Sequence, residues 1–422
     1  MDKRTKIIAT ISDKRCEVEF IRSLYEAGMN AVRINTAHVT TRSAATIVEN
    51  VRRVSEKIAI IIDTKGPEIR LTGMAAGFES GIPIEKGQLV RMKGTAEDRP
   101  SSDQTIYLND PTIYDAVPTG SIILIDDGEL ELQVVDKADD ELVCEVHNGG
   151  VIKPRKSVNI PGVPIDLPSV TDKDHEFINW AIDMDIDFIA HSFVRKKSDV
   201  LAVKKILKDR NSSIKIISKI ENSEGVDNID EILDETYGIM VARGDLGVEI
   251  PAERIPVTQR LLVKKCIESK KPVIIATQML HTMIEHPRPT RAEISDVANA
   301  IYQRVDAVML SGETANGLYP VEAVATMARV AREIENDEVN NGPNIDMNLV
   351  RINNEITAQL ARSAVRASIN LRVKAIVIDT LSGRTGRYVA AFRGQMPVYA
   401  VCYRKSTMRQ LALSYGVHAI YC

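Results

Sequence analysis

The chain has 422 residues, of which 44% are hydrophobic and 27% charged, and its formal net charge is -4. A chain of this length exceeds one hydrophobic core of ordinary size, so we expect two or three domains. The slight acidic excess argues against a nucleic-acid-binding protein, which usually carries a basic surface.

The cysteines and the hydropathy of the chain favour a cytoplasmic protein. The five cysteines lie far apart and form no Cys-x-x-Cys pair, which disfavours a disulfide framework and a structural zinc site. The N-terminal stretch MDKRTKIIATIS lacks the apolar core of a signal peptide, and no apolar run is long enough to cross a bilayer. We therefore expect neither secretion nor insertion into a membrane.

Eight short apolar runs, rich in β-branched residues and ending in polar or glycine residues, predict eight strands. They cover residues 5–11, 30–35, 59–64, 187–193, 214–221, 238–245, 272–278 and 306–313. Most are followed by a segment of helical periodicity, such as VEFIRSLYEAGM or VTQRLLVKKCIES. Eight alternating units predict an α/β fold of the (β/α)8 TIM-barrel type, whose active site lies at the C-terminal ends of the strands.

The segment between the third and fourth runs is too long for a single connection in such a barrel. It holds strand-like runs such as QLVRMK and ELVCEV between turn dipeptides, so residues 68–165 predict an inserted β-barrel lid domain. Residues 1–67 and 166–337 are then the catalytic barrel. After a polar linker at 336–348, residues 338–422 predict a third, α/β domain with two strands and a helix as its last element.

The predicted strands end in an unusual set of charged and polar residues. In chain order these are Arg33, Asn35, His38, Asp63, Lys65, Arg70, His191, Ser192, Lys219, Glu221, Arg243, Asp245, Thr277, Gln278, Ser311 and Glu313. In a barrel these cations and carboxylates converge on one mouth. The loops after barrel strands are solvated in any case, so each residue taken singly is more readily explained as structural.

The run IKIISKIEN raises the sharpest question, because it ends in Lys219 and Glu221 on the same side of an otherwise apolar strand. Burying a charge is costly unless the charge is compensated. One explanation is a plain buried ion pair. The other gives each residue its own role: Glu221 with Asp245 would hold Mg2+, and Lys219 would direct its charge at a transferring anionic group.

Two glycine-containing loops predict anion sites, and each has a structural alternative. ARGDLGVEIP, with Gly244 and Gly247 ahead of a helix, would dock a carboxylate or phosphate, or form an ordinary tight turn. TLSGRTGR would be an effector phosphate site or a polar helix cap, and it contains Thr380, Ser382, Gly383, Arg384 and Thr385. The chain has no Gly-x-x-x-x-Gly-Lys-Ser/Thr motif, so a bound nucleotide is not held by a P-loop.

Several long segments resemble the signature segments of pyruvate kinase, in the same order and spacing. They include AGMNAVRINTAH, IDTKGPEIR, VNIPG, ISKIEN, GIMVARGDLGVEIP, ATQML, PRPTRAEISDVANAI and DAVMLSGETANGLYPVEAV. The match runs from residue 3 to the end of the chain. The resemblance implies a glycolytic enzyme that uses Mg2+ or Mn2+ and transfers a phosphoryl group from phosphoenolpyruvate to ADP, giving pyruvate and ATP.

The resemblance also implies roles for single residues, carried over by position. Lys219 matches the family's transition-state lysine, and Arg33 matches its phosphate-binding arginine. The backbone of Gly244 and Asp245 and the side chain of Thr277 match the groups that hold the substrate carboxylate. Positioning and cationic stabilisation are what a loose phosphoryl-transfer transition state requires, so these roles are physically consistent.

The same comparison implies a proton relay, nucleotide contacts and metal ligands. The relay to the enolate would use Thr277 and Ser311, the nucleotide contacts would be Asn35, His38, Arg70 and Lys156, and the divalent-metal ligands would be Glu221 and Asp245. Three of the family's four potassium ligands are present, namely Asn35, Asp63 and Thr64. A homotetramer is the family expectation for the oligomeric state.

Two features depart from the family pattern. The fourth potassium ligand, a serine, is replaced by Ala37, while the neighbouring Glu68 is retained, so we expect K+ activation that is weakened but present. The chain ends at GVHAIYC, before the last strands and the glycine-rich effector loop of the family's C-terminal domain. We therefore expect an incomplete C-terminal domain, and allosteric control by a phosphorylated effector is only an implication of the TLSGRTGR loop.

Two other functions are weighed against this one. A lyase of phosphoenolpyruvate and pyruvate chemistry would share the metal pair, but it would need neither Lys219 beside a nucleotide site nor the inserted domain. A non-catalytic regulatory protein descended from the kinase would fit Ala37 and the short C-terminal domain. Such a protein would have no need for the costly cluster of charges around Lys219.

Overall fold

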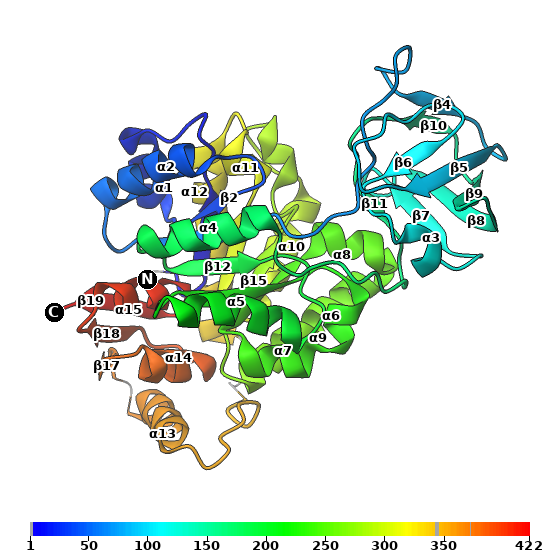
Figure 1. The fold of residues 1–422 in the computed structure, drawn as a ribbon. Helices are drawn as coiled ribbons and strands as arrows, with labels where there is room; N and C mark the ends of the chain where they lie inside the picture. Colours follow the sequence, from blue (N-terminus) through cyan, green and yellow to red (C-terminus); the bar gives the residue numbers. More distant parts are fainter. Residues whose placement is uncertain (1–2, 342–345, 372) are drawn as a thin grey trace.

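The structure is a computed structural model that describes residues 3–341, 346–371 and 373–422. Residues 342–345 of the predicted linker therefore lie outside the described residues, and its residues 336–341 form the end of a helix instead of a linker. Within the described ranges, no helix has both the length and the apolar composition that a bilayer crossing requires. Figure 1 shows a barrel surrounded by helices, a group of strands set to one side of it, and a smaller unit below it.

The eight predicted strands form one closed, parallel barrel, which confirms the predicted fold class. They are β1 (Lys6–Thr10), β2 (Ala31–Asn35), β3 (Ala59–Asp63), β12 (Phe188–His191), β13 (Lys215–Ile220), β14 (Gly238–Ala242), β15 (Val273–Ala276) and β16 (Ala307–Leu310). Their order around the barrel is β1-β16-β15-β14-β13-β12-β3-β2. Barrel strands that are consecutive along the chain are thus also neighbours in the barrel.

Side chains along the barrel strands alternate between two cores, because successive residues of a strand point to opposite faces. Ile217 belongs to the core inside the barrel, and Ile216 to the core between the barrel and its helices. Lys219 and Glu221 continue the inward row of Ile217, whereas His191 continues the outward row of β12. The period of two therefore carries the charges of IKIISKIEN to the mouth of the barrel.

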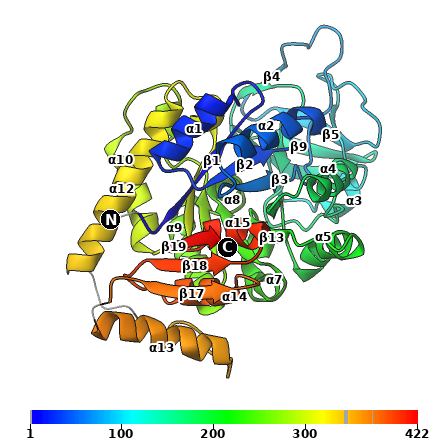
Figure 2. The ribbon, with the colours of Figure 1, turned by 90° about the vertical axis from the view of Figure 1, so that its left-hand side faces the viewer.

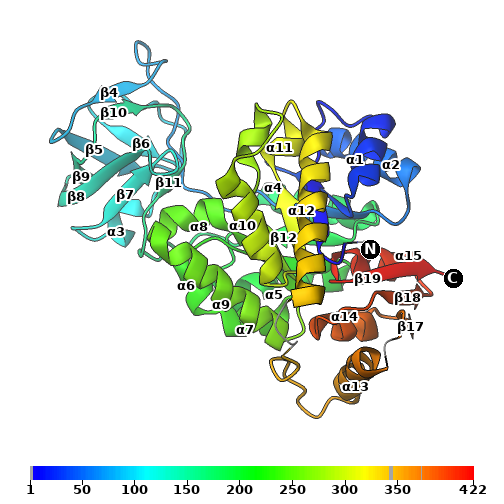
Figure 3. The same ribbon diagram turned by 180° about the vertical axis from the view of Figure 1, so that it is seen from behind.

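Helices cover the outside of the barrel, as the periodic segments predict. They are α1 (Val18–Ala27), α2 (Thr41–Val54), α4 (Asp172–Asp183), α5 (Lys197–Asp209), α6 (Ser223–Asp227), α7 (Ile229–Glu235), α8 (Arg243–Glu249), α9 (Ile255–Glu268), α10 (Arg291–Tyr302), α11 (Gly312–Ala315) and α12 (Pro320–Asn341), with 3-10 helices η1 (Ala252–Arg254) and η2 (His281–Ile284). Thr40, Thr171 and Thr290 each cap a helix by accepting the backbone N–H three residues on. Figure 3 shows α10 and α12 packed side by side.

Residues 68–165, called the insertion here, form a separate group of strands between β3 and α4 (Figure 1). The elements are β4 (Ile82–Ile84), β5 (Leu89–Gly94), β6 (Ile106–Leu108), α3 (Ile113–Ala116), β7 (Ile122–Ile125), β8 (Leu130–Ala138), β9 (Glu141–Val146), β10 (Gly150–Ile152) and β11 (Val158–Asn159). They make a six-stranded sheet, β11-β7-β8-β9-β5-β6, and a two-stranded pair, β10-β4. The insertion has its own hydrophobic core.

The C-terminal unit (residues 346–371 and 373–422) contains a parallel sheet of order β17-β18-β19. Its elements are α13 (Ile356–Asn370), β17 (Ile376–Thr380), α14 (Arg384–Ala391), β18 (Val398–Cys402), α15 (Lys405–Gln410), η3 (Leu411–Leu413) and β19 (Val417–Tyr421). The expectation that a helix is the last element was wrong. Residues 417–421 pair along their whole length with β18, a long-range contact that five residues of sequence do not reveal.

The C-terminal unit packs against the N-terminal ends of the barrel strands, opposite the mouth, and Figure 2 shows its sheet beside the barrel. Two buried carboxylates at that end bind arginines of the unit. Asp306, just before β16, accepts from both terminal nitrogens of Arg393. Asp187, just before β12, accepts from Arg409. The unit is thus attached through charges as well as through its apolar face.

Candidate active site

Lys219 lies at the centre of a buried cluster of charges at the barrel mouth. Its Nζ lies 2.9 Å from Oε1 of Glu221 and 3.1 Å from Oδ1 of Asp63, and it donates to the Ser192 hydroxyl at 2.8 Å. Asp63 also accepts from Nε of Arg33 at 2.5 Å. Only 11% of the Lys219 side chain and 1% of the Glu221 side chain are exposed. The two charges of IKIISKIEN thus form an ion pair, and this pair belongs to a larger network.

The buried charges shift one another's ionisation. Burial alone would lower the pKa of Lys219, but the carboxylates of Asp63 and Glu221 outweigh it and hold this pKa above its ordinary value. Burial raises the pKa of Glu221, and Asp245 adds to the rise while Lys219 opposes it. Burial also favours a higher pKa for Asp63, but the charges of Arg33 and Lys219 prevail and lower it. Lys219 is therefore a fixed cation at neutral pH.

Asp245 and Thr277 follow the next two barrel strands. Asp245 lies in the first turn of α8, directly after the strand that pairs with β13, and its charge adds to the rise in the pKa of Glu221. The Thr277 hydroxyl accepts the Gly244 N–H at 2.7 Å. The residues that the sequence predicts for divalent-metal and carboxylate binding are therefore grouped beside Lys219.

The turn after β15 has a strained backbone. Thr277 and Gln278 have φ angles of 65° and 53°, the left-handed region that non-glycine residues seldom adopt and that β-branched residues avoid. Arg243 holds this turn, since it donates to the Thr277 carbonyl at 2.8 Å and to Asp296 at 2.7 Å. The strain presents the Thr277 side chain to the Gly244 backbone.

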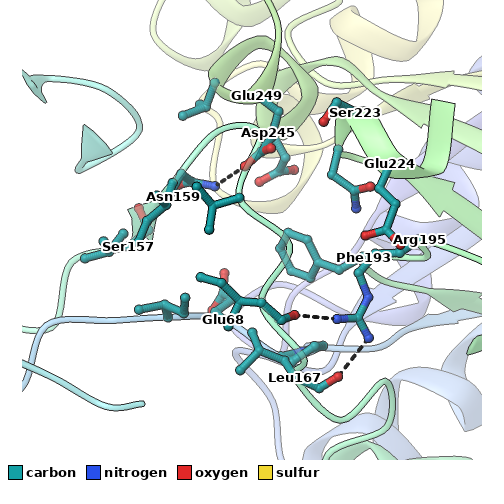
Figure 4. A pocket seen from close by; sticks show the side chains of 18 of the residues that line it. Glu68, Ser157, Asn159, Leu167, Phe193, Arg195, Ser223, Glu224, Asp245 and Glu249 are labelled. Carbon is teal, nitrogen blue, oxygen red and sulfur yellow. Dashed lines mark hydrogen bonds between the residues drawn. The ribbon is translucent and has the colours of Figure 1, made fainter. Parts of the chain in front are cut away.

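A cavity of about 730 Å3 lies between these strand ends and the insertion (Figure 4). The barrel contributes Asp245 and Glu249 to its lining, and the insertion contributes Arg70 and Lys156. Asn159 of the insertion donates to Glu249 of the barrel at 3.3 Å, as Figure 4 shows. A cavity of this size is typical of small-molecule and cofactor sites.

The four residues predicted to contact a nucleotide do not all reach this cavity. Arg70 pairs with Glu68 at 2.8 Å, and Lys156 Nζ lies 2.8 Å from Asp126, all at the cavity wall. His38 is exposed on the loop after β2, and neither it nor Asn35 is among the lining residues. The structure therefore groups Arg70 with Lys156, and nucleotide binding by any of the four stays a prediction.

The residues predicted to bind K+ lie at the adjoining ends of β2 and β3. Asn35 is opposite Asp63 in the strand register and accepts the Ala37 N–H at 3.1 Å. Thr64 accepts the Ser192 N–H at 2.9 Å. Ala37 offers only its backbone carbonyl. In the described part of the chain, no group of three or more His, Cys, Asp or Glu side chains is arranged to hold a metal ion, so any metal here needs other oxygen ligands.

The two remaining predicted features are Ser311 and the TLSGRTGR loop. Ser311 follows β16, with its N–H donating to Glu313 at 2.7 Å, and within the described part of the chain no hydrogen bond links it to Thr277. The TLSGRTGR loop joins β17 to α14 at the end of the molecule opposite the mouth. There the Thr380 hydroxyl accepts the Gly383 N–H at 3.0 Å, a bond within the loop, and no side chain of the described residues caps α14, so the polar helix cap is not observed. An effector site at this loop stays a prediction.

Comparisons with known proteins assign the chain to a family. A model described as "Pyruvate kinase, barrel domain" matches residues 2–324, and one described as "Pyruvate kinase, alpha/beta domain" matches residues 358–422. The pyruvate kinase of Borreliella burgdorferi is 48% identical over 99% of this chain and 86% of its own length. The chain belongs to the pyruvate kinase family. The pyruvate kinases of Geobacillus stearothermophilus and Bacillus licheniformis are 46% and 45% identical, over 71% and 72% of their lengths.

Membership of the pyruvate kinase family makes the chain a phosphotransferase, as the signature segments imply. The two alternative functions, a lyase and a non-catalytic regulatory protein, are thereby rejected. Sequence analysis assigned no role to two groups that contact this charged cluster. The Ser192 hydroxyl accepts from Lys219, and the Phe193 N–H donates to Glu221 at 2.7 Å. The polar residues His191 and Ser192 near the end of the fourth predicted strand were the available signal.

Proposed function

We propose that the centre around Lys219 transfers the phosphoryl group of phosphoenolpyruvate to ADP, giving pyruvate and ATP. The observation that carries this proposal is a buried Lys219 held between the carboxylates of Asp63 and Glu221, near a cavity of about 730 Å3. Phosphoryl transfer requires mainly that the reactants be positioned and that cations surround the transferring group. Lys219 and Arg33 would supply those cations.

The carboxylates Glu221 and Asp245 fit a divalent cation. Burial raises the pKa of Glu221 and the charge of Asp245 adds to the rise, so a cation of charge two beside Glu221 would offset both effects. Oxygen ligands suit Mg2+ or Mn2+, which keep several positions for water and substrate. When bound, the ion would neutralise charge that develops on the transferring group.

The substrate carboxylate would dock at the start of α8. The N–H groups of Gly244 and Asp245 begin this helix, and Gly244 has no side chain to block an approaching anion. The Thr277 hydroxyl accepts the Gly244 N–H, and a bound carboxylate oxygen would replace it as the acceptor. After transfer, the enolate carbon takes a proton, and Thr277 with Ser311 is the proposed route.

The insertion would supply the nucleotide contacts. Arg70 and Lys156 line the cavity from that side, where two cations can bind the ADP phosphates. Both are paired with acids of the insertion, Glu68 and Asp126, which keep their side chains in place before ligand binds. K+ would bind at Asn35, Asp63 and Thr64, with one oxygen fewer because residue 37 is alanine.

The direct test measures both products separately. Wild-type protein with phosphoenolpyruvate, ADP, Mg2+ and K+ is expected to form ATP and pyruvate in equal amounts, and to form neither when ADP or the divalent cation is omitted. Pyruvate formed without ATP would indicate a lyase or a phosphatase and would contradict the proposal. No product under any condition would also contradict it.

A further inference from the structure

Residues 192–195, which follow β12, contact both the catalytic centre and the connections to the insertion. We call residues 64–67 the first linker and residues 163–171 the second linker, whose first three residues are also the last three of the insertion. On the catalytic side, Ser192 accepts from Lys219 at 2.8 Å, and the Phe193 N–H donates to Glu221 at 2.7 Å. These two residues therefore touch the proposed transition-state cation and the proposed metal ligand.

The same residues lie against the first linker. The Ser192 hydroxyl donates to the Thr64 carbonyl at 2.7 Å. Gly66 has a φ of +70°, and a Cβ there would lie 2.7 Å from Cδ2 of Phe193 and 2.8 Å from Cβ of Ser192. No side chain fits at this position, so the linker backbone lies directly on the Phe193 ring.

Arg195 holds the second linker. Its Nη1 donates to the Ile165 carbonyl at 2.9 Å and its Nη2 to the Leu167 carbonyl at 2.8 Å, as Figure 4 shows for Leu167. The guanidinium is oriented by Asp199, and the side chain is only 14% exposed. The planar guanidinium donates to two carbonyls that lie two residues apart, and this fixes the path of the backbone in the second linker.

Residues 192–195 are themselves held in one conformation. Phe193 has a φ of 53°, and the Asn228 side chain donates to the Arg195 carbonyl at 3.0 Å. Gly225 packs so closely that a Cβ there would lie 2.4 Å from the Val194 carbonyl oxygen. The segment therefore has little room to adjust, and a shift of either linker would be passed on through it.

We propose that Arg195 is a positioning residue that sets the insertion over the barrel mouth, and that residues 192–195 couple this position to Lys219 and Glu221. The inference rests on the proposed function, because it concerns how two halves of one site meet. Arg70 and Lys156 belong to the insertion, whereas Lys219 and Glu221 belong to the barrel. Phosphoryl transfer needs these halves in register, and a misplacement of 1 Å can cost about 100-fold in rate.

A purely structural role for Arg195 is the competing explanation, since its backbone N–H also meets Asp199 at the start of α5. The test compares Arg195→Ala and Arg195→Lys with Arg210→Ala. Arg210 pairs with Asn179 and Asp183 at the other end of α5, far along the helix from both linkers. This variant controls for the loss of an arginine near α4 and α5.

Steady-state kinetics are expected to show a selective effect. Arg195→Ala should raise KM for ADP at least about tenfold and lower kcat, while KM for phosphoenolpyruvate changes less than about twofold. Arg195→Lys should lie between Arg195→Ala and wild type, and free guanidinium should restore part of the rate of Arg195→Ala. Hydrogen exchange of the amides at residues 163–167 should accelerate in Arg195→Ala but not in Arg210→Ala.

Gly66→Ala tests the coupling from the first linker, and the same rise in KM for ADP is expected. Equal changes in both KM values, or wild-type kinetics despite faster exchange in the second linker, would overturn the proposal. If wild type and Arg210→Ala form no ATP, the proposed function has failed. If they are active and Arg195→Ala matches them, only the role of Arg195 has failed.

Discussion

Asp306→Ala is expected to loosen the C-terminal unit from the barrel. Asp306 is 2% exposed, and its carboxylate accepts four hydrogen bonds: two from Arg393 at 2.8 and 2.5 Å, one from the Tyr415 N–H at 3.0 Å and one from the Val273 N–H at 3.1 Å. Its removal leaves the buried Arg393 guanidinium uncompensated, which costs about 3–5 kcal/mol. Each orphaned N–H adds about 1 kcal/mol or more. We therefore expect a loss of about 5–7 kcal/mol.

Hydrogen exchange in β17 to β19 measures this loss, because the unit is expected to open before the barrel unfolds. Urea unfolding followed by the single tryptophan, Trp180, reports the barrel in the same samples. Glu56→Ala, which breaks the exposed pair with Lys405, is the control and should change stability by less than about 0.5 kcal/mol. A loss below about 1 kcal/mol in Asp306→Ala would refute the reasoning.

Two further predictions concern acid stability and K+. Burial lowers the pKa of His191 from 6.5 to about 4, so between these pH values only the unfolded chain binds the proton, and stability falls by up to about 3 kcal/mol as pH drops through that window. His191→Leu should flatten that part of the urea-unfolding profile, and an unchanged profile would count against it. Ala37→Ser restores a ligand oxygen and should lower the K+ concentration for half-activation about tenfold, or about 1.4 kcal/mol. Full wild-type activity in K+-free buffer would contradict the K+ site.

The barrel could be predicted from the sequence because its signals are local. Each strand is an apolar run with a polar end, and the period of two alone places Lys219 and Glu221 on one inward row. The insertion was detectable because its hairpin turns contain residues such as Asp139 and Asp140, whose φ angles of 55° and 59° suit two-residue turns.

The contacts that the predicted site residues make could not be predicted from the sequence in the same way. Asp63 was assigned to K+, whereas in the structure it binds Lys219 and Arg33, because neighbouring strands of a closed barrel bring their ends together. The contacts of Arg195 have no sequence signature, since its acceptors are backbone carbonyls. The strand at 417–421 depends on pairing with β18, and its own residues give only a weak signal.

The rate of pyruvate and ATP formation by Lys219→Met tests the central claim most directly. Lys208→Met is the matched control, because Lys208 is an exposed lysine on α5. Loss of a cation that acts on the transferring group should lower kcat at least about 1000-fold, as removal of comparable groups does in other phosphoryl-transfer enzymes. Lys208→Met should keep wild-type kcat. Equal rates for the two variants would show that Lys219 is a structural ion-pair partner and that phosphoryl transfer takes place without it.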